Sequence, residues 1–209
     1  MCIRDRSYDH GSSAPFSVGW WAESDGSDIE LPDGRILHTV KGDLFRIHEW
    51  YGADKREANL GLRMLSTEIA DGIKEREIIL KENGLVSGRI RPGPADTSIW
   101  NEDDGPSIAK KMQGRGIIWT KADKGPGSRK QGWEEMRQRF KGSKSKNGFR
   151  EERGIFIFST CTDFIDLIPV LPRDDKDLDD VDTHAEDHIG DETRYRLRKP
   201  KRVAKVSDM

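Results

Sequence analysis

Residues 154–159, with the sequence GIFIFS, limit most strongly how this chain can fold. The four central residues are β-branched or aromatic, which favours a strand. Because no polar residue interrupts them, the strand is expected to be covered on both faces, as in sheets that carry helices on both sides. Residues 162–171 are predicted to form a helix, which must end before Pro172. The two elements together indicate an α/β architecture.

The opening fifty residues have the pattern of an antiparallel meander. Residues 8–15 hold a tight Gly/Ser turn after a first strand, and Asp25-Gly26 and Asp33-Gly34 are turn signals. Further strands are predicted in residues 16–22, 35–40 and 44–51, which are rich in β-forming residues.

The rest of the chain alternates helices with short strands. Helices are predicted at residues 59–83, 105–112 and 131–140, and a buried strand at residues 117–119. Residues 87–91 run into a Pro/Gly-rich loop that contains Asp96, and residues 122–130 and 141–150 are expected to be flexible and basic. These elements predict a mixed α/β sheet, an antiparallel meander plus parallel strands, flanked by helices.

Length and composition favour one domain with a modest core. Of the 209 residues, 35% are charged and 33% apolar. We expect residues 1–6 (MCIRDR) to be an uninformative leader, since they resemble the spurious leaders of some assembled environmental sequences and imply a chain that began upstream. Residues 7–198 are expected to form the domain, and residues 199–209 a basic, disordered tail.

The distribution of charge and the number of cysteines limit which classes of protein fit this sequence. The net charge of −2 hides an acidic stretch at residues 173–192 and a basic one at residues 194–205, so a polyanionic partner remains open. Cys2 and Cys161 form no disulfide framework and fit a reducing compartment. No apolar run reaches the roughly 18 residues that a membrane span needs. We therefore expect a soluble, intracellular protein.

Several common active-site motifs are missing from the sequence. It contains no G-x-x-x-x-G-K-[ST] phosphate loop and no strand followed by G-x-G-x-x-G, so nucleotide binding has no support. Two cysteines without metal-ligand spacing give none to a zinc site. No G-x-S-x-G elbow supports serine hydrolysis.

Residues 182–197 (DTHAEDHIGDETRYRL) concentrate acids near the C-terminus. In a helix, Asp187 and Asp191 lie four apart on one face, and His188 lies three before Asp191. Like charges at this spacing repel by about 0.2–0.5 kcal/mol, which a divalent cation would turn into attraction. The alternative is a solvated acidic face. Glu186, Asp182 and His184 are assigned to that solvated class.

Three acids stand at the ends of predicted elements: Asp9 at the first strand, Asp96 after a middle strand, and Asp191 on the last helix. Convergence on one sheet edge would create the carboxylate cluster that two-metal phosphodiester hydrolysis requires. Taken singly, Asp9 could be a turn-former and Asp96 a capping or Asx-turn residue. Spacing alone leaves these alternatives open.

Four segments together resemble the C-terminal nuclease domain of phage large terminase subunits, which has a ribonuclease H-like fold. They are residues 9–21 (DHGSSAPFSVGWW), 95–100 (ADTSIW), 105–109 (GPSIA) and 186–195 (EDHIGDETRY). The opening Asp-x-Gly-Ser-Ser and the closing acid-His-x-x-Asp-x-x-Arg-Tyr are the most specific parts. The resemblance spans residues 9–197 and implies that Asp9, Asp96 and Asp191 bind metal, that His188 assists them, and that Asp187 is a weaker candidate.

The chain departs from this family in two respects that bear on function. The ATPase domain with its phosphate loop is missing, so either the sequence is a fragment or the nuclease is encoded separately. His10 stands where many members carry an aromatic residue, which leaves the role of that position open.

The resemblance implies metal-dependent cleavage of concatemeric double-stranded viral DNA during genome packaging, in the cytoplasm of a bacterial host. Mg²⁺ or Mn²⁺ at a two-metal site would be the cofactor. Implied partners, besides DNA, are the portal, the small terminase subunit and a packaging ATPase domain encoded upstream. The alternatives are another ribonuclease H-like nuclease of the resolvase type and a non-catalytic module that docks on DNA or the portal.

Basic residues in the two loop-like stretches are candidate phosphate contacts, with solvated loops as the alternative. They are Lys121, Lys124, Arg129, Lys130, Lys141, Lys144 and Lys146. The basic segment 194–205 could contact DNA or the portal, or be disordered.

Overall fold

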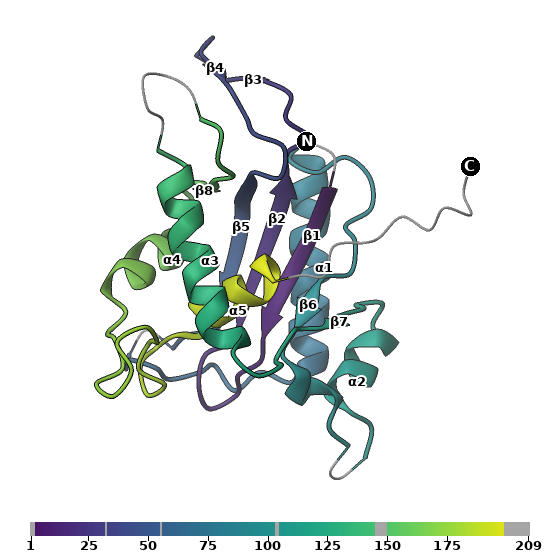
Figure 1. Cartoon of the computed structure of the whole chain (residues 1–209). Helices are drawn as coiled ribbons and strands as arrows, with labels where there is room; N and C mark the ends of the chain where they lie inside the picture. Colours follow the sequence, from purple (N-terminus) through teal and green to yellow (C-terminus); the bar gives the residue numbers. More distant parts are fainter. Residues whose placement is uncertain (1–2, 32, 55, 103–104, 145–149, 199–209) are drawn as a thin grey trace, which may run out of the picture.

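A six-stranded mixed sheet with helices on both faces forms the centre of the computed structural model, which describes residues 3–31, 33–54, 56–102, 105–144 and 150–198 (Figure 1). The strands are β1 (Ile3–Asp9), β2 (Ser17–Glu23), β3 (Ile29–Glu30), β4 (Ile36–Leu37), β5 (Leu44–Tyr51), β6 (Pro94–Ala95), β7 (Thr120–Lys121) and β8 (Ile155–Ile157). The helices are α1 (Ser66–Glu82), η1 (Thr97–Trp100), α2 (Ile108–Gly114), α3 (Ser128–Gly142), α4 (Thr162–Leu167), η2 (Ile168–Val170) and α5 (His188–Leu197).

The sheet order is β7-β6-β1-β2-β5-β8. Strands β1, β2 and β5 pair antiparallel as the predicted meander, whereas β6, β7 and β8 pair parallel with their neighbours. The predicted mixed α/β sheet is therefore confirmed. No helix in the described part of the chain is long and apolar enough to cross a membrane.

Opposite faces of the sheet meet different helices because successive strand residues point to opposite sides. Trp20 belongs to the large core that contains Ile69 and Ile73 of α1. Trp21 packs instead with Leu44 on the side of α3 and α5. Figure 1 shows α1 behind the sheet and α3 and α5 in front of it. β8 also contacts both sides, since Phe156 packs against the first core and Ile155 lies in the second.

The helix predicted at residues 59–83 begins at Ser66. Asn59 and Arg63 have φ values of 56° and 55°, in the left-handed region, so residues 59–65 cannot continue the helix. Their backbone instead bonds to the turn that follows β1, with the Gly61 N–H donating to the Ser13 carbonyl at 2.7 Å. The helical spacing of apolar residues among charges began before the first residue of the helix itself.

The strand predicted at residues 117–119 is wrong. Ile117 and Trp119 are buried beside Met112, but the parallel ladder contains only the next two residues, as β7. An apolar run alone did not distinguish a buried loop from a strand. The strand predicted at residues 35–40 is reduced to β4, which pairs with β3 in a separate two-stranded sheet.

Three other element boundaries also differ from the predictions. α3 begins at Ser128, so Arg129 and Lys130 are helical and do not lie in a flexible loop. The helix predicted at residues 162–171 ends at Leu167 and is followed by η2. Within residues 182–197, which were considered as a helix, α5 begins only at His188.

Residues 3–6 belong to the stretch that was expected to be an uninformative leader. They form the first half of β1, pairing with β2, and two of them are buried. The Asp5 carboxylate accepts from Arg196 Nε at 2.6 Å, and Arg6 bonds to Glu77 at 2.7 Å. Residues 1–2 and the predicted tail at residues 199–209 lie outside the described residues.

Gly93 allows β6 to approach β1. A Cβ at this position would lie 1.7 Å from the Arg6 carbonyl oxygen, which belongs to the backbone and cannot move aside easily.

We expect Gly93→Ala to lower the free energy of unfolding by about 2–3 kcal/mol, measured by urea denaturation. Gly114→Ala is the matched control, because no atom lies within 4 Å of its added Cβ and the residue ends α2. It should leave stability unchanged or raise it by up to about 1 kcal/mol; an equal loss in both variants would contradict the prediction.

Candidate active site

Asp9 and Asp96 lie side by side where two parallel strands end. Tyr8 pairs with Ala95 across β1 and β6, and each acid follows its paired residue by one position. The Asp96 N–H donates to the Tyr8 carbonyl at 3.0 Å, which fixes the register. The Tyr195 hydroxyl of α5 contacts both acids, at 3.3 Å from Asp9 Oδ1 and 3.1 Å from Asp96 Oδ2.

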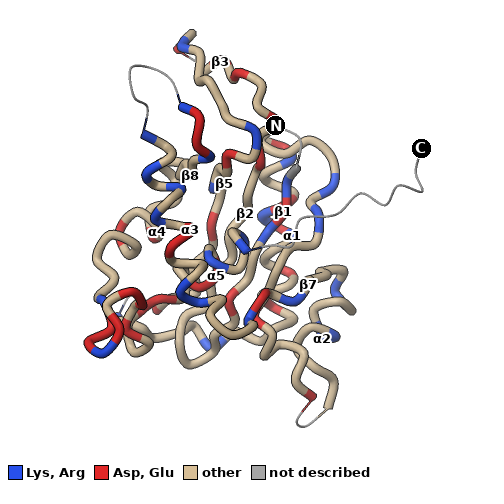
Figure 2. Tube along the Cα trace, viewed as in Figure 1, with Lys and Arg blue, Asp and Glu red and all other residues tan. Residues whose placement is uncertain are grey.

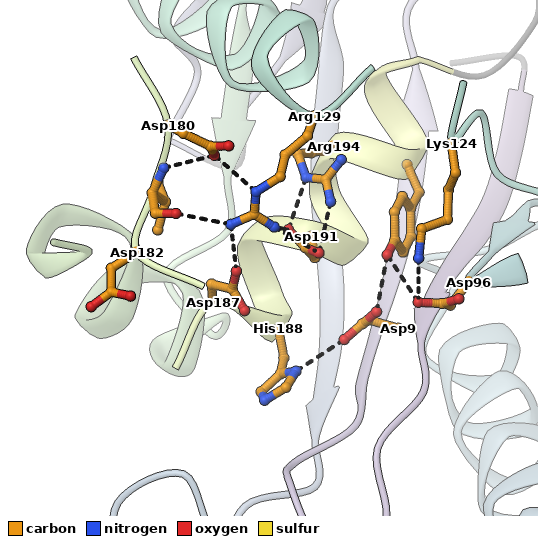
Figure 3. A network of polar contacts seen from close by, with 12 residues as sticks. Asp9, Asp96, Lys124, Arg129, Asp180, Asp182, Asp187, His188, Asp191 and Arg194 are labelled. Carbon is orange, nitrogen blue, oxygen red and sulfur yellow. Dashed lines mark hydrogen bonds and ion pairs between the residues drawn. The ribbon is translucent and has the colours of Figure 1, made fainter. Parts of the chain in front are cut away.

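Helix α5 brings His188 to the same place from the far end of the sequence. Its Nδ1 lies 3.0 Å from Asp9 Oδ2 (Figure 3). Its Nε2 lies 3.0 Å from Asn59 Oδ1. Since the Asn59 amide oxygen can only accept, it favours a proton on Nε2. Asp191 lies on the same helix, three residues on, and faces a group of basic side chains.

Arg129, near the start of α3, pairs with several acids around the site. Its Nη1 lies 3.1 Å from Asp191 Oδ1, and its Nη2 lies 2.9 Å from Asp187 Oδ2. The remaining contacts are Nε to Asp180 Oδ1 at 2.8 Å and Nη2 to the Val181 carbonyl at 3.1 Å. Every nitrogen of this guanidinium therefore has a protein acceptor.

Two further cations hold the other carboxylates. Lys124 Nζ lies 3.0 Å from Asp96 Oδ2, and Arg194 Nε lies 2.8 Å from Asp191 Oδ1 (Figure 3). The Ser98 N–H donates to Asp96 Oδ1 at 2.7 Å, so Asp96 also caps η1, as the capping alternative proposed. Asp96 is thus both a cap and a member of the acidic group.

Burial makes Asp9 the most perturbed acid of the site. Removal from water raises the pKa of Asp9 to about 7, against the opposing effect of the His188 hydrogen bond, and the nearby Asp191 raises it further. Burial lowers the pKa of His188, but its hydrogen bond to Asp9 outweighs this, so the pKa of His188 is raised. The charged form of Asp9 is therefore costly in the absence of an additional cation.

The pKa values of the other two acids, Asp96 and Asp187, are shifted in opposite directions. Burial raises the pKa of Asp96, but hydrogen bonds from the Ser98 N–H and from Lys124 outweigh it, and the pKa of Asp96 is lowered. Burial, followed by the nearby Asp191, raises the pKa of Asp187 despite its bond to Arg129. The surroundings of Asp96 thus favour its charged form, whereas burial disfavours the charged forms of Asp9 and Asp187.

Within the described residues, no group of three or more His, Cys, Asp or Glu side chains is arranged to hold a metal ion. Lys124, Arg129 and Arg194 instead pair with the carboxylates of Asp96, Asp187 and Asp191. The donor chemistry, buried or half-buried carboxylate oxygens from three elements, suits a hard divalent cation. Such an ion would have to replace some of these ion pairs.

Sequence reasoning missed two residues of this site. Tyr195 lies within the quoted acid-His-x-x-Asp-x-x-Arg-Tyr pattern and four residues after Asp191, so helical spacing could have placed it beside the acids. Asn59 gave no local signal, because its contact with His188 joins residues 129 positions apart. Glu186 was assigned to the solvated acids, yet it accepts from the Tyr51 hydroxyl at 2.8 Å and the Asn59 N–H at 3.2 Å.

The candidate DNA-binding residues fall into three groups. Lys124, Arg129 and Lys130 lie at or beside the site, and Lys121 lies over the Trp100 ring, 5.7 Å from its centroid. Lys141 and Lys144 lie at the opposite end of α3 from Arg129, away from the acids. Lys146 lies outside the described residues.

Comparison with known proteins gives a consistent fold assignment. No family model and no curated protein matches the sequence. The large terminase of a thermophilic bacteriophage superposes with a TM-score of 0.58 and 16% identity, covering 93% of this chain and 39% of that terminase. The P22 large terminase nuclease domain superposes with a TM-score of 0.55 and 13% identity, covering 94% of this chain and 80% of that domain. The chain therefore has the fold of a large-terminase nuclease domain, as the resemblance implied, and spans about two-fifths of the length of the thermophilic phage protein.

Proposed function

We propose that this chain is a metal-dependent DNA endonuclease of the large-terminase type, which cleaves concatemeric double-stranded viral DNA during genome packaging. The observation that carries the proposal is that Asp9 contacts His188 directly and Asp96 through the Tyr195 hydroxyl, at one end of the sheet (Figure 3). Asp191, on the same helix as His188, is near enough to raise the pKa of Asp9. A packed fold has no structural need to bring several carboxylates together, since their mutual repulsion raises the cost of charging them.

Each acid has a distinct role in this proposal. Asp9, Asp96 and Asp191 would bind Mg²⁺ or Mn²⁺, with Asp187 as a further ligand. The metal would polarise the scissile phosphate and acidify an attacking water. His188 holds Asp9 in place and can accept or donate a proton there, while the Tyr195 hydroxyl sets the separation of Asp9 and Asp96. Lys124 and Arg129, once displaced by the metal, would contact DNA phosphates.

The biological setting is part of the same proposal and rests on the family resemblance. The nuclease would act in the cytoplasm of a bacterial host, together with a packaging ATPase domain encoded upstream, the small terminase subunit and the portal. A resolvase-type nuclease and a non-catalytic docking module remain as outcomes of the test.

Metal dependence tests the proposal directly. We expect purified protein to nick and linearise supercoiled plasmid with millimolar Mn²⁺ or Mg²⁺, and to leave it intact with EDTA. Cutting of four-way junctions in preference to plain duplex would indicate the resolvase type. Plasmid that stays intact with Mn²⁺, while circular dichroism shows folded protein that still binds duplex DNA, would indicate the docking module.

A further inference from the structure

Residues 174–182 form an acidic segment beside the site. With the sequence DDKDLDDVD, they hold six aspartates and one lysine. Figure 2 shows acidic residues gathered at one corner of the molecule, where this segment links η2 to α5. A segment of such charge is expected to extend into solvent, because its like charges repel.

The segment is instead closed into a loop by its own backbone. Arg173 and Val181 form a bridge, so its two ends lie together. Within it, Asp174 Oδ1 accepts the Lys176 and Asp177 N–H groups at 2.8 Å and 3.0 Å. The charges are therefore held in one place.

Two adjacent cations of α3 attach the loop to the domain. Lys130 pairs with Asp177, and Arg129 bonds to Asp180 at 2.8 Å and to the Val181 carbonyl at 3.1 Å. These cations lie in the first turn of α3, where the helix dipole adds positive potential. The same features attract phosphates, and Arg129 also contacts Asp187 and Asp191 in the site.

We propose that residues 174–182 are an internal competitor of DNA, pairing with Arg129 and Lys130 in the free protein and leaving them when the DNA backbone binds. This inference rests on the proposed function, since it requires that the site receives DNA. The carboxylates of the loop stand where phosphates would otherwise bind. Because they are tethered to the same chain, they compete at a high effective concentration.

The double variant Asp177→Asn/Asp180→Asn tests the competition. Asparagine can still accept the Asp179 and Val181 N–H groups that the two acids now accept, so the loop keeps its turns while losing its charge pairs. Binding to a duplex of about 30 base pairs is measured by fluorescence anisotropy in EDTA, which keeps the DNA intact. We expect the dissociation constant to fall about tenfold.

The salt dependence provides a second expected result. In the wild type, phosphates replace carboxylates at Arg129 and Lys130, so no extra counterions are released there. In the variant Lys130 is free before binding, whereas Arg129 keeps its pairs with Asp187 and Asp191. The slope of log K against log salt should therefore steepen by about 0.9.

The matched control is Asp28→Asn/Asp33→Asn, which changes net charge equally at two exposed acids in the β3–β4 region. Its affinity should stay within about twofold of wild type, with an unchanged slope. If Asp177→Asn/Asp180→Asn binds DNA no more tightly than this control, the inference is overturned.

Hydrogen exchange of the wild type gives an independent readout. DNA should accelerate exchange of the amides in residues 174–182, because the loop loses its anchors; slower exchange would overturn the inference. The result is separable from nuclease activity. If the protein cleaves plasmid with Mn²⁺ but shows no competition, only this inference is overturned. If it shows competition but never cleaves DNA, only the nuclease assignment is overturned. Failure to bind DNA in every variant overturns both.

Discussion

Asp9→Asn is expected to reduce the rate of Mn²⁺-dependent DNA cleavage on the order of 10³-fold while leaving the fold intact. Asp9 contacts both His188 and Tyr195, so it joins the two strand ends to α5. Asparagine keeps the size of the side chain and one acceptor oxygen but removes the charge that would bind the metal. The measurement is the initial rate of plasmid nicking.

Stability against pH shows whether the variant acts through this charge. Burial raises the pKa of Asp9 from 3.8 to about 7, so the folded protein retains a proton that the unfolded chain releases. The free energy of unfolding should therefore fall as the pH rises from about 4 through 7, and the raised pKa of His188 lowers it further once the pH exceeds the ordinary value of 6.5. Asparagine does not titrate. In EDTA, Asp9→Asn should thus gain stability relative to wild type as the pH rises, measured by thermal denaturation.

The control for this prediction is Asp33→Asn. Asp33 is an exposed acid between β3 and β4, and it pairs with Arg35. The control variant should cut DNA at the wild-type rate. If Asp9→Asn also cuts at that rate, Asp9 is no part of the reaction. If Asp191→Asn alone cuts normally, the role assigned to α5 is wrong.

Arg46→Met is expected to lower the free energy of unfolding by about 3–5 kcal/mol. Arg46 is fully buried between the Trp21 and Phe164 rings, with centroid distances of 5.1 Å and 5.0 Å. It bonds to Glu192 at 2.5 Å and to Glu49 at 3.1 Å. Methionine fills much of the volume but leaves two buried carboxylates without their cation, which costs far more than the lost packing.

The consequences of this substitution should reach the active site. Glu192 follows Asp191 directly in α5, and it also accepts from Ser7 of β1 and from Trp21 of β2. Loss of Arg46 loosens the attachment of α5 to the sheet, so cleavage should fall together with stability. Chemical denaturation measures the first effect and plasmid nicking the second.

Arg56→Met is the matched control, because Arg56 pairs with Asp54 while 84% of its side chain is exposed. Its effect on stability should stay within about 0.5 kcal/mol. An Arg46→Met variant that unfolds at the same denaturant concentration as Arg56→Met would show that the buried pairs contribute little.

The sequence predicted the sheet more reliably than the limits of its elements. Strands β2 and β5 were expected because β-forming runs alternate with Gly and Asp turns, a signal that needs only neighbouring residues. The helix start at Ser66 was missed because backbone contacts of residues 59–65 with the turn after β1 override the local pattern. The loop at residues 117–119 was missed because an apolar run alone does not distinguish a buried loop from a strand. The same limitation made residues 3–6 look uninformative, although Arg6 is anchored by Glu77 of α1.

For the candidate site, the sequence determined which acids stand at element ends, and the family resemblance indicated that they belong together. Only the tertiary structure decided how they are paired: Asp9 with His188 across 179 positions, Asp191 with Arg129 across 62, and Asp96 with Lys124 across 28. Hydrophobic periodicity is local, so it can be read from the chain. A charge's partner depends on which segments the packed core brings within about 4 Å, and no spacing along the chain records that.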